Sequence, residues 1–252
     1  MLKKIAKWTG IIVLVLLVCI VTAGLLIHET KPKGTSGVEA DALANKILAA
    51  IDKPAWDSTK YVHWNFNNMH TYLWDKERHY VRVRWGKNEV LLHTKSVTGK
   101  AFVNGTEVSG DDANDLVQTA WNYFCNDSFW LNAPAKVFDP GTSRSLVEEN
   151  DGSKNLMISY DSGGVTPGDS YLWKMDGEGL PMSYKMWVQI IPIGGVGATW
   201  EGWETLSTGA KVSTLHKMAG FSLNMTEVKG GMTAEDIGET NDPFASFQPT
   251  LK

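Results

Sequence analysis

The sequence predicts an α+β fold, a strongly curved antiparallel β-sheet (a half-barrel) with helices on its concave side, preceded by one transmembrane helix. Three observations support this prediction. Apolar and polar residues alternate over 60–108 and 143–229, with short turns between the alternating segments, as in antiparallel strands. Residues 38–52 and 112–125 have helical periodicity instead. An uncharged apolar run, residues 10–27, comes first.

The composition is that of a folded protein. The chain has 252 residues, of which 43% are hydrophobic and 21% are charged, and its formal charge is −4. Residues 1–33 hold five lysines and one acid, which leaves 19 basic and 27 acidic residues, a balance of −8, in the rest. An acidic body argues against a nucleic-acid partner. Two cysteines exclude a disulfide framework and a cysteine-based zinc site.

The N-terminal segment has the features of a membrane anchor. Residues 10–27 would form a helix roughly 27 Å long, close to the ~30 Å hydrocarbon core of a bilayer. Residues 1–9 form a basic flank with Lys3, Lys4 and Lys7, which the positive-inside rule keeps in the cytoplasm. We therefore expect a single-pass protein of the inner (cytoplasmic) membrane with its body on the periplasmic side.

A cleaved signal peptide is the alternative interpretation of this segment. Val21 and Ala23 have the spacing of a cleavage site, and cleavage there would secrete the body. The apolar run continues through residues 25–27, beyond that point, which favours the anchor. Residues 28–37 are polar and contain proline and glycine, so they predict a linker.

The body, residues 38–230, begins with a predicted helix over 38–52. Ser36 followed by Glu39 is a capping-box pattern, and Pro54 is expected to stop the helix. One apolar face should pack on the sheet, formed by Val38, Ala42, Leu43, Ile47, Leu48 and Ile51.

Residues 60–108 predict about five strands. Short turns at 75–77 and 86–88 separate strands, and Asn104-Gly105 is typical of a type I′ hairpin turn. The alternation predicts that one face is buried, with Val62, Trp64, Phe66, Leu73, Val81, Val83 and Trp85 on it.

A second helix is predicted over 112–125, with Asp111 or Asp112 as its N-cap. A bulky apolar loop, Phe129-Trp130-Leu131, should follow it. About seven strands come next, at 143–149, 154–160, 169–176, 181–191, 199–206, 211–218 and 221–229. Two glycine-rich hairpin loops, 163–169 and 192–198, interrupt them, and residues 231–252 predict a loosely packed tail.

This order of elements resembles the LolA/LolB-like family of bacterial periplasmic lipoprotein carriers. The resemblance covers roughly residues 38–230 and depends on the first helix, the tryptophan-bearing strands and the phrases YLWD, WLNAP and YLWKMDGEGLP. It implies a half-barrel capped by helices over an apolar cavity. The predicted transmembrane helix departs from the family, whose carriers are free or lipid-anchored, and no functional residue of the family can be matched here.

No motif in the sequence predicts a catalytic residue, a metal site or a cofactor. The six histidines have no metal-ligand spacing, and no nucleophile elbow, P-loop or dinucleotide motif is present. An enzyme is therefore not favoured. The carboxylates Asp161, Asp169, Asp176 and Glu178, together with the tryptophans, leave open a glycan-binding or glycan-cleaving protein.

The 11 tryptophans are the most unusual feature of the sequence. They either fill a core or line a cavity for an apolar ligand. We predict a membrane-anchored extracytoplasmic binding protein for a lipid or other apolar ligand, with residues 129–131 as a gate. A structural partner in an envelope complex is a further alternative. The predicted ligand-binding residues are Trp64, Trp85, Trp121, Phe124, Phe129, Trp130, Trp173 and Trp187.

Overall fold

The structure is a computed structural model that describes residues 2–162, 165–245 and 247. Its helical elements are α1 (Leu2–Ile27), α2 (Val38–Ala50), α3 (Lys53–Ser58), α4 (Asp111–Asn132), η1 (Ala133–Lys136) and η2 (Glu235–Ile237). The strands before α4 are β1 (Tyr61–Phe66), β2 (His70–Asp75), β3 (Tyr80–Trp85), β4 (Asn88–His93), β5 (Thr98–Val103) and β6 (Thr106–Val108). Those after it are β7 (Thr142–Glu148), β8 (Lys154–Tyr160), β9 (Ser170–Met175), β10 (Pro181–Trp187), β11 (Val196–Thr199), β12 (Glu201–Thr205), β13 (Lys211–Met218) and β14 (Phe221–Gly231).

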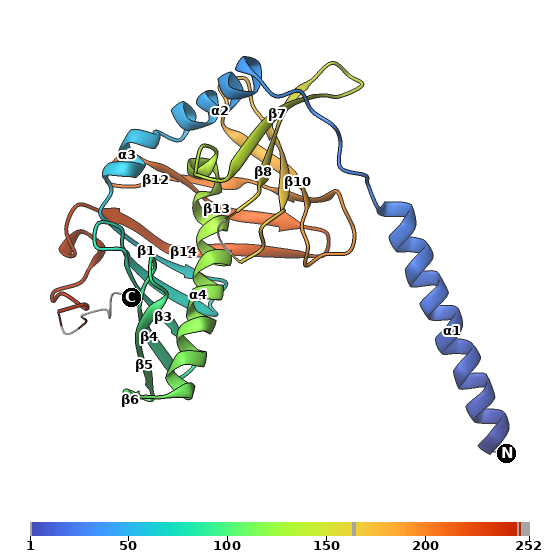
Figure 1. The fold of residues 1–252 in the computed structure, drawn as a ribbon, viewed down its shortest axis with the longest axis horizontal. Helices are drawn as coiled ribbons and strands as arrows, with labels where there is room; N and C mark the ends of the chain where they lie inside the picture. The colour runs from blue at the N-terminus through green and yellow to red at the C-terminus, as the bar shows by residue number, and fades with distance from the viewer. Residues whose placement is uncertain (1, 163–164, 246, 248–252) are drawn as a thin grey trace.

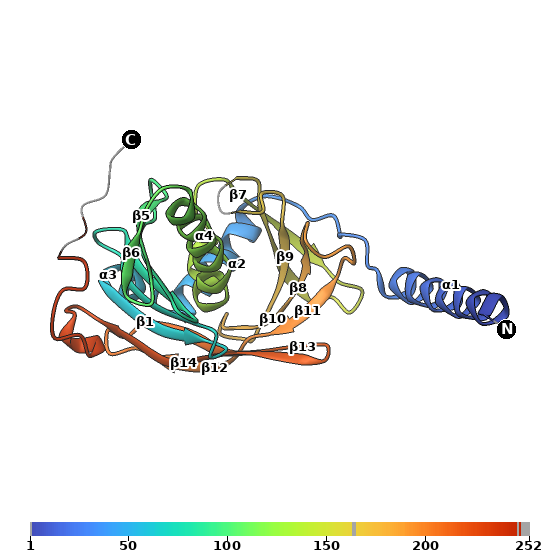
Figure 2. The ribbon, with the colours of Figure 1, turned by 90° about the horizontal axis from the view of Figure 1, so that it is seen from below.

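The strands form one 14-stranded antiparallel sheet in the order β6-β5-β4-β3-β2-β1-β14-β13-β11-β10-β9-β8-β7, with β12 paired to β13. The first and last strands of the body, β1 and β14, pair in the middle, so two meanders join into one sheet. The sheet is open and curves strongly around the helices (Figure 2). The predicted curved antiparallel sheet is thereby confirmed.

Helix α4 connects the two edge strands, β6 and β7, across the concave side of the sheet (Figures 1 and 2). Its 22 residues correspond to about 33 Å, which is long enough to cross the opening. It contacts β4, β5 and β13, whereas α2 contacts β7 and β8. The concave side therefore holds two helices and most of the hydrophobic core.

The predicted strand alternation is confirmed for β1, whose buried residues are Val62, Trp64 and Phe66. Asn104 and Gly105 both have positive φ, 50° and 78°, as a type I′ turn requires.

The second helix is longer than its predicted range of 112–125, and the bulky loop expected after it was wrong. Residues 129–131 lie within α4. Asn126, Asp127 and Ser128 interrupt the apolar pattern and are weak helix formers. The buried side chain of Asp127 is paired with β2, so the helix continues through it.

The capping box and the stop at Pro54 were also wrong. The residue before α2 is Gly37, and no side chain caps the helix. Glu39 instead forms an ion pair with Lys154, 2.9 Å away. Pro54 lies in the first turn of α3, where its missing N–H costs no hydrogen bond.

Part of the predicted loose tail is packed on the sheet. Ile237, Phe244 and Phe247 are buried in a second hydrophobic cluster with Leu73 and Leu91. Leu73 therefore lies on the opposite face of β2 from its neighbours in the main core, which corrects the predicted placement. Both faces of this part of the sheet are covered, so alternation could not indicate which face points inward.

The predicted linker, residues 28–37, is docked on the second half of the sheet. The backbone N–H of Glu29 donates to the carbonyl of Gly194 at 2.9 Å, and the indole of Trp187 donates to the carbonyl of Glu29 at 2.7 Å. Lys185 forms an ion pair with Glu29. The predicted glycine-rich loop 192–198 ends before β11, which begins at Val196. Gly194 leaves room for the linker, since a Cβ there would lie 2.6 Å from the Glu29 carbonyl oxygen.

Helix α1 covers the predicted basic flank and membrane anchor. Within the described part of the chain, no helix is long and apolar enough to cross a bilayer. Several side chains of the predicted anchor, including that of Cys19, lie outside the described residues. The transmembrane helix remains a prediction of the sequence.

Candidate functional site: a cavity beneath α4

A cavity of about 580 Å³ lies between α4 and the concave face of the sheet. Its lining extends from Trp74 on β2, along α4, to Tyr160 on β8 and Leu223 on β14. The volume falls in the range of about 300–1,000 Å³ that is typical of small-molecule sites, and the lining is predominantly apolar.

Helix α4 supplies the aromatic wall of the cavity. Trp121, Phe124, Cys125, Phe129 and Trp130 of this helix all line it. Phe124 and Trp130 are nearly buried, and the other three are half-buried. Burial raises the pKa of the Cys125 thiol to about 12, so this wall carries no thiolate at neutral pH.

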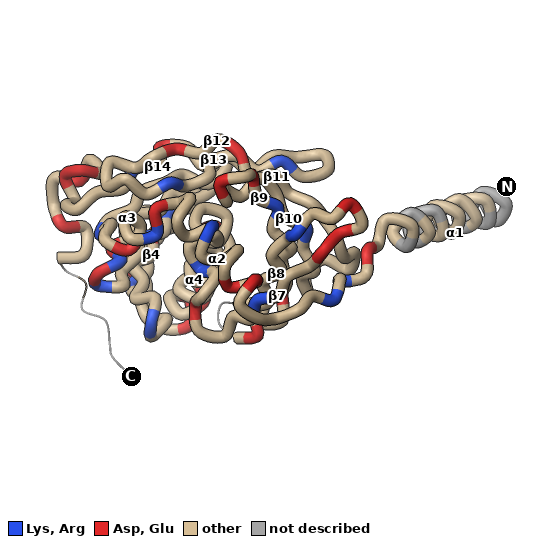
Figure 3. The backbone as a smooth tube through the Cα atoms, turned by 90° about the horizontal axis from the view of Figure 1, so that it is seen from above, with Lys and Arg blue, Asp and Glu red and all other residues tan. Residues whose placement is uncertain are grey.

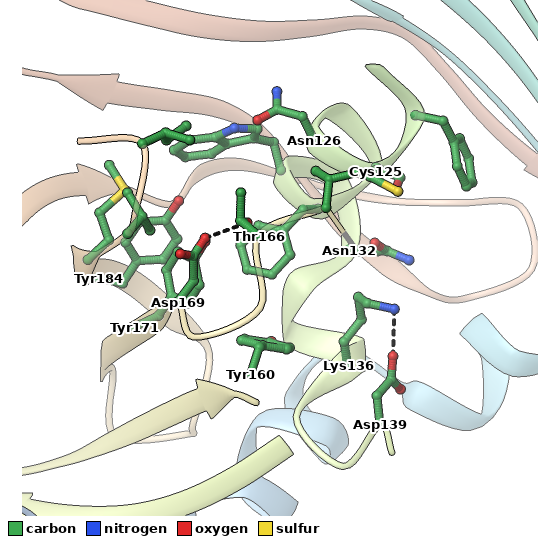
Figure 4. Close-up of a pocket in the computed structure, with 18 of the residues that line it drawn as sticks. Cys125, Asn126, Asn132, Lys136, Asp139, Tyr160, Thr166, Asp169, Tyr171 and Tyr184 are labelled. Atoms are coloured by element: carbon green, nitrogen blue, oxygen red, sulfur yellow. Dashed lines mark hydrogen bonds and ion pairs between the residues drawn. The ribbon is translucent and has the colours of Figure 1, made fainter. Parts of the chain in front are cut away.

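Three tyrosines from adjacent strands form the facing wall. The ring centroids of Tyr160 and Tyr171 are 5.8 Å apart, and those of Tyr171 and Tyr184 are 5.1 Å apart. Figure 4 shows these tyrosines, and Phe129 packs against Tyr160 and Tyr171 with ring centroids 5.5 and 4.8 Å away. Burial raises the pKa of each tyrosine above its ordinary value, so the hydroxyls stay protonated donors.

Several polar atoms of the lining are buried without a hydrogen-bond partner among the described residues. They are Trp74 Nε1, Asn132 Oδ1 and the hydroxyl oxygens of Tyr160 and Tyr184. Tyr184 is only 1% exposed. Buried polar groups are almost always paired in folded proteins, so four unpaired atoms in one lining are unusual.

The charged groups of the lining are already satisfied. The Asp169 carboxylate accepts hydrogen bonds from the Thr166 hydroxyl at 2.6 Å and the Gln189 N–H at 2.9 Å. Lys136 forms a 2.5 Å ion pair with Asp139 (Figure 4). One cation and two anions line the described part of the cavity, a formal balance of −1.

Exposed apolar side chains surround the opening of the cavity. Val165, Ile190 and Phe221 all line it and are 43%, 72% and 53% exposed. Ile190 stands a few residues before Gly194, where the linker docks. The opening therefore includes a residue that is close in sequence to Gly194, where the linker is docked.

The predicted ligand-binding residues fall into two groups. Trp121, Phe124, Phe129 and Trp130 line the cavity. The other four do not: Trp64 and Trp173 are fully buried in the core, Trp85 packs on Tyr123, and Trp187 holds the linker.

Sequence reasoning missed the three tyrosines. Tyr160, Tyr171 and Tyr184 stand in separate strands, and only the pairing of β8, β9 and β10 brings them together. The pattern within one strand does not indicate which other strands will pair with it.

Of the carboxylates considered for glycan chemistry, only Asp169 lines the cavity. The Asp176 carboxylate accepts hydrogen bonds from the N–H groups of Glu178 and Leu180, so it stabilises a turn. No group of three or more histidine, cysteine or acidic side chains is arranged to hold a metal ion in the part of the chain that the structure describes.

A buried carboxylate fixes α4 to the first meander. Asp127, 2% exposed, accepts a hydrogen bond from the Tyr72 hydroxyl at 2.6 Å and lies 2.7 Å from His70 Nδ1. His70 in turn stacks on Tyr123 of the helix. These contacts position the aromatic wall of the cavity over the sheet.

Basic side chains (Lys and Arg) and acidic side chains (Asp and Glu) are interspersed around the body in the view of Figure 3.

No family model matches the chain, and no curated protein is similar to it in sequence. Among solved structures, it is similar to a DUF1329 family protein from Desulfovibrio piger, with 10% identity and a TM-score of 0.37. The match covers 83% of this chain and 97% of that one.

Proposed function

We propose that this protein is an extracytoplasmic binding protein that holds a lipid or similar apolar ligand in the cavity beneath α4. The proposal depends on the volume of the cavity and on the kinds of side chain that line it. A space of about 580 Å³ is bounded mainly by aromatic and aliphatic side chains, with a few buried polar atoms. Sites for apolar small molecules have this composition.

The N-terminal segment supports a position at a membrane. Its apolar run and basic flank have the length and charge of a signal anchor with a cytoplasmic N-terminus. The docked linker would then hold the body close to the bilayer, and the ligand would exchange over a short distance. The exposed rim of Val165, Ile190 and Phe221 offers an apolar path between bilayer and cavity.

Residues 129–131 do not gate the cavity in this proposal. They lie within α4, and Trp130 and Leu131 are buried. Their displacement would require the helix to unfold or detach, which would also break the Asp127 contacts with β2. We therefore place ligand access at the rim.

The proposal is tested by extracting bound lipid from the purified full chain and measuring it by mass spectrometry. Ile191→Trp adds bulk to a half-buried lining position and is expected to reduce bound lipid about tenfold, equivalent to ~1.4 kcal/mol of binding free energy. Val38→Trp, on an 85% exposed residue of α2, is the matched control and should retain the wild-type amount. Equal amounts in both variants would contradict binding in this cavity.

A further inference from the structure

The buried polar atoms of the lining indicate the chemical class of the ligand, which the apolar walls alone do not. Four of the buried atoms that lack a partner among the described residues line the cavity, and three of these are N–H or O–H donors, in Trp74, Tyr160 and Tyr184. A purely hydrocarbon ligand would leave them unpaired, at a cost of about 1–3 kcal/mol for each group. The lining therefore suits a ligand that brings oxygen acceptors.

The charges of the lining disfavour one kind of oxygen acceptor. Lys136, the cation that lines the described part of the cavity, is held by Asp139, and the neighbouring wall contains the Asp169 carboxylate. Asp169 already receives hydrogen bonds from Thr166 and Gln189, with Tyr171 a further donor at 3.4 Å. A free carboxylate would enter an apolar space of net negative charge without a cation to pair with.

We propose that the cavity selects a neutral, ester-bearing lipid over the corresponding free fatty acid, with Tyr160 and Tyr184 donating hydrogen bonds to its ester oxygens. This inference rests on the proposed function and specifies its ligand class. The two tyrosines lie on β8 and β10, and their rings flank that of Tyr171 on the sheet side of the cavity (Figure 4).

The test uses the full chain in mild detergent and three brominated probes of equal chain length: a monoacylglycerol, a fatty acid and an alkane. Bromine quenches tryptophan fluorescence on contact, and Trp74, Trp121 and Trp130 line the cavity. At pH 7.5 the monoacylglycerol is expected to bind at least about tenfold more tightly than the fatty acid. Acidification should strengthen fatty-acid binding, because the protonated acid is neutral, and leave monoacylglycerol binding unchanged.

Tyr160→Phe with Tyr184→Phe removes both hydroxyls and keeps the rings. The double variant should bind the monoacylglycerol about 10-fold more weakly or worse and the alkane with unchanged affinity. Tyr80→Phe is the matched control, because Tyr80 packs on Phe244 and Phe247 away from the cavity, and it should bind all three probes as the wild type does.

Two failures are distinguishable. If the fatty acid binds as tightly as the monoacylglycerol at pH 7.5, or the double variant binds it like the wild type, the inferred ligand class is wrong although the cavity still binds lipid. If none of the three probes quenches the tryptophan fluorescence of the wild type, the proposed function itself fails.

Discussion

At the scale of single residues, the tryptophans have three different roles. Trp64 stacks on Tyr72 in the core with ring centroids 4.4 Å apart, Trp121 lines the cavity, and Trp187 holds the linker. A large aromatic residue contributes buried area wherever it lies, so its presence in a strand does not indicate which role it has.

His216 is a second residue whose behaviour depends on its surroundings. It is fully buried between Trp130 and Trp200, and its Nδ1 lies 3.0 Å from the carbonyl of Thr199. Burial lowers its pKa from 6.5 to about 4. The unfolded chain thus binds a proton more readily than the folded one, so this residue reduces stability as the pH falls from about 6.5 toward 4.

We expect His216→Gln to weaken this acid dependence. Between pH 7.5 and pH 5, the free energy of unfolding of the wild type should fall by about 2 kcal/mol more than that of the variant. Urea denaturation at both pH values measures the difference, and contributions from other histidines cancel between the two proteins. Identical losses in both would show that His216 is not held neutral by burial.

At the scale of elements, the linker is docked on the body and does not act as a flexible tether. Besides the contacts at Glu29, Thr35 forms an antiparallel bridge with Leu146, and Lys31 donates to Ser170 at 3.3 Å. The linker therefore runs along the second meander with its backbone paired at both ends. A segment held in this way must open locally before a protease can cleave it.

Gly194→Ala should release the linker, because the new Cβ would collide with the Trp187 ring and lie 2.6 Å from the Glu29 carbonyl. We expect trypsin to cleave the folded variant after Lys33 about tenfold faster than the wild type, as local unfolding becomes easier by ~1.4 kcal/mol. Gly177→Ala is the control, since nothing lies within 4 Å of its new Cβ. Equal cleavage rates in all three proteins would contradict the docking.

At the scale of the whole molecule, two meanders and the helix between them enclose a cavity that neither meander could form alone. Strands β8, β9 and β10 supply the tyrosines, β2 supplies Trp74, and α4 supplies the aromatic wall. The pairing of β1 with β14 closes the arrangement at the centre of the sheet.

The proposed orientation of the protein in the membrane is a second prediction about the whole molecule. With Lys3, Lys4 and Lys7 in the cytoplasm, the body should face outward. Protease added to intact spheroplasts is expected to degrade the body and leave a cytoplasmic marker protein intact, as immunoblotting can show. Full protection of the body until the cells are lysed would contradict the orientation.

The sequence by itself determined most of the elements and the class of fold. Alternation in segments such as 61–66 and the turn at Asn104-Gly105 predicted an antiparallel meander correctly, because period-2 burial and positive φ are local properties of the chain. The helical period of 112–125 likewise predicted a helix over the sheet, and α4 contains it.

Only the tertiary structure decided what the elements build together. The extension of α4 depends on Asp127, which is buried because Tyr72, 55 residues away, donates to it. The inward or outward direction of Leu73 depends on Phe244 and Phe247 at the far end of the chain. The row of Tyr160, Tyr171 and Tyr184 depends on strand pairing. Each is a contact between distant segments, and local periodicity carries no information about which distant segment will be the neighbour.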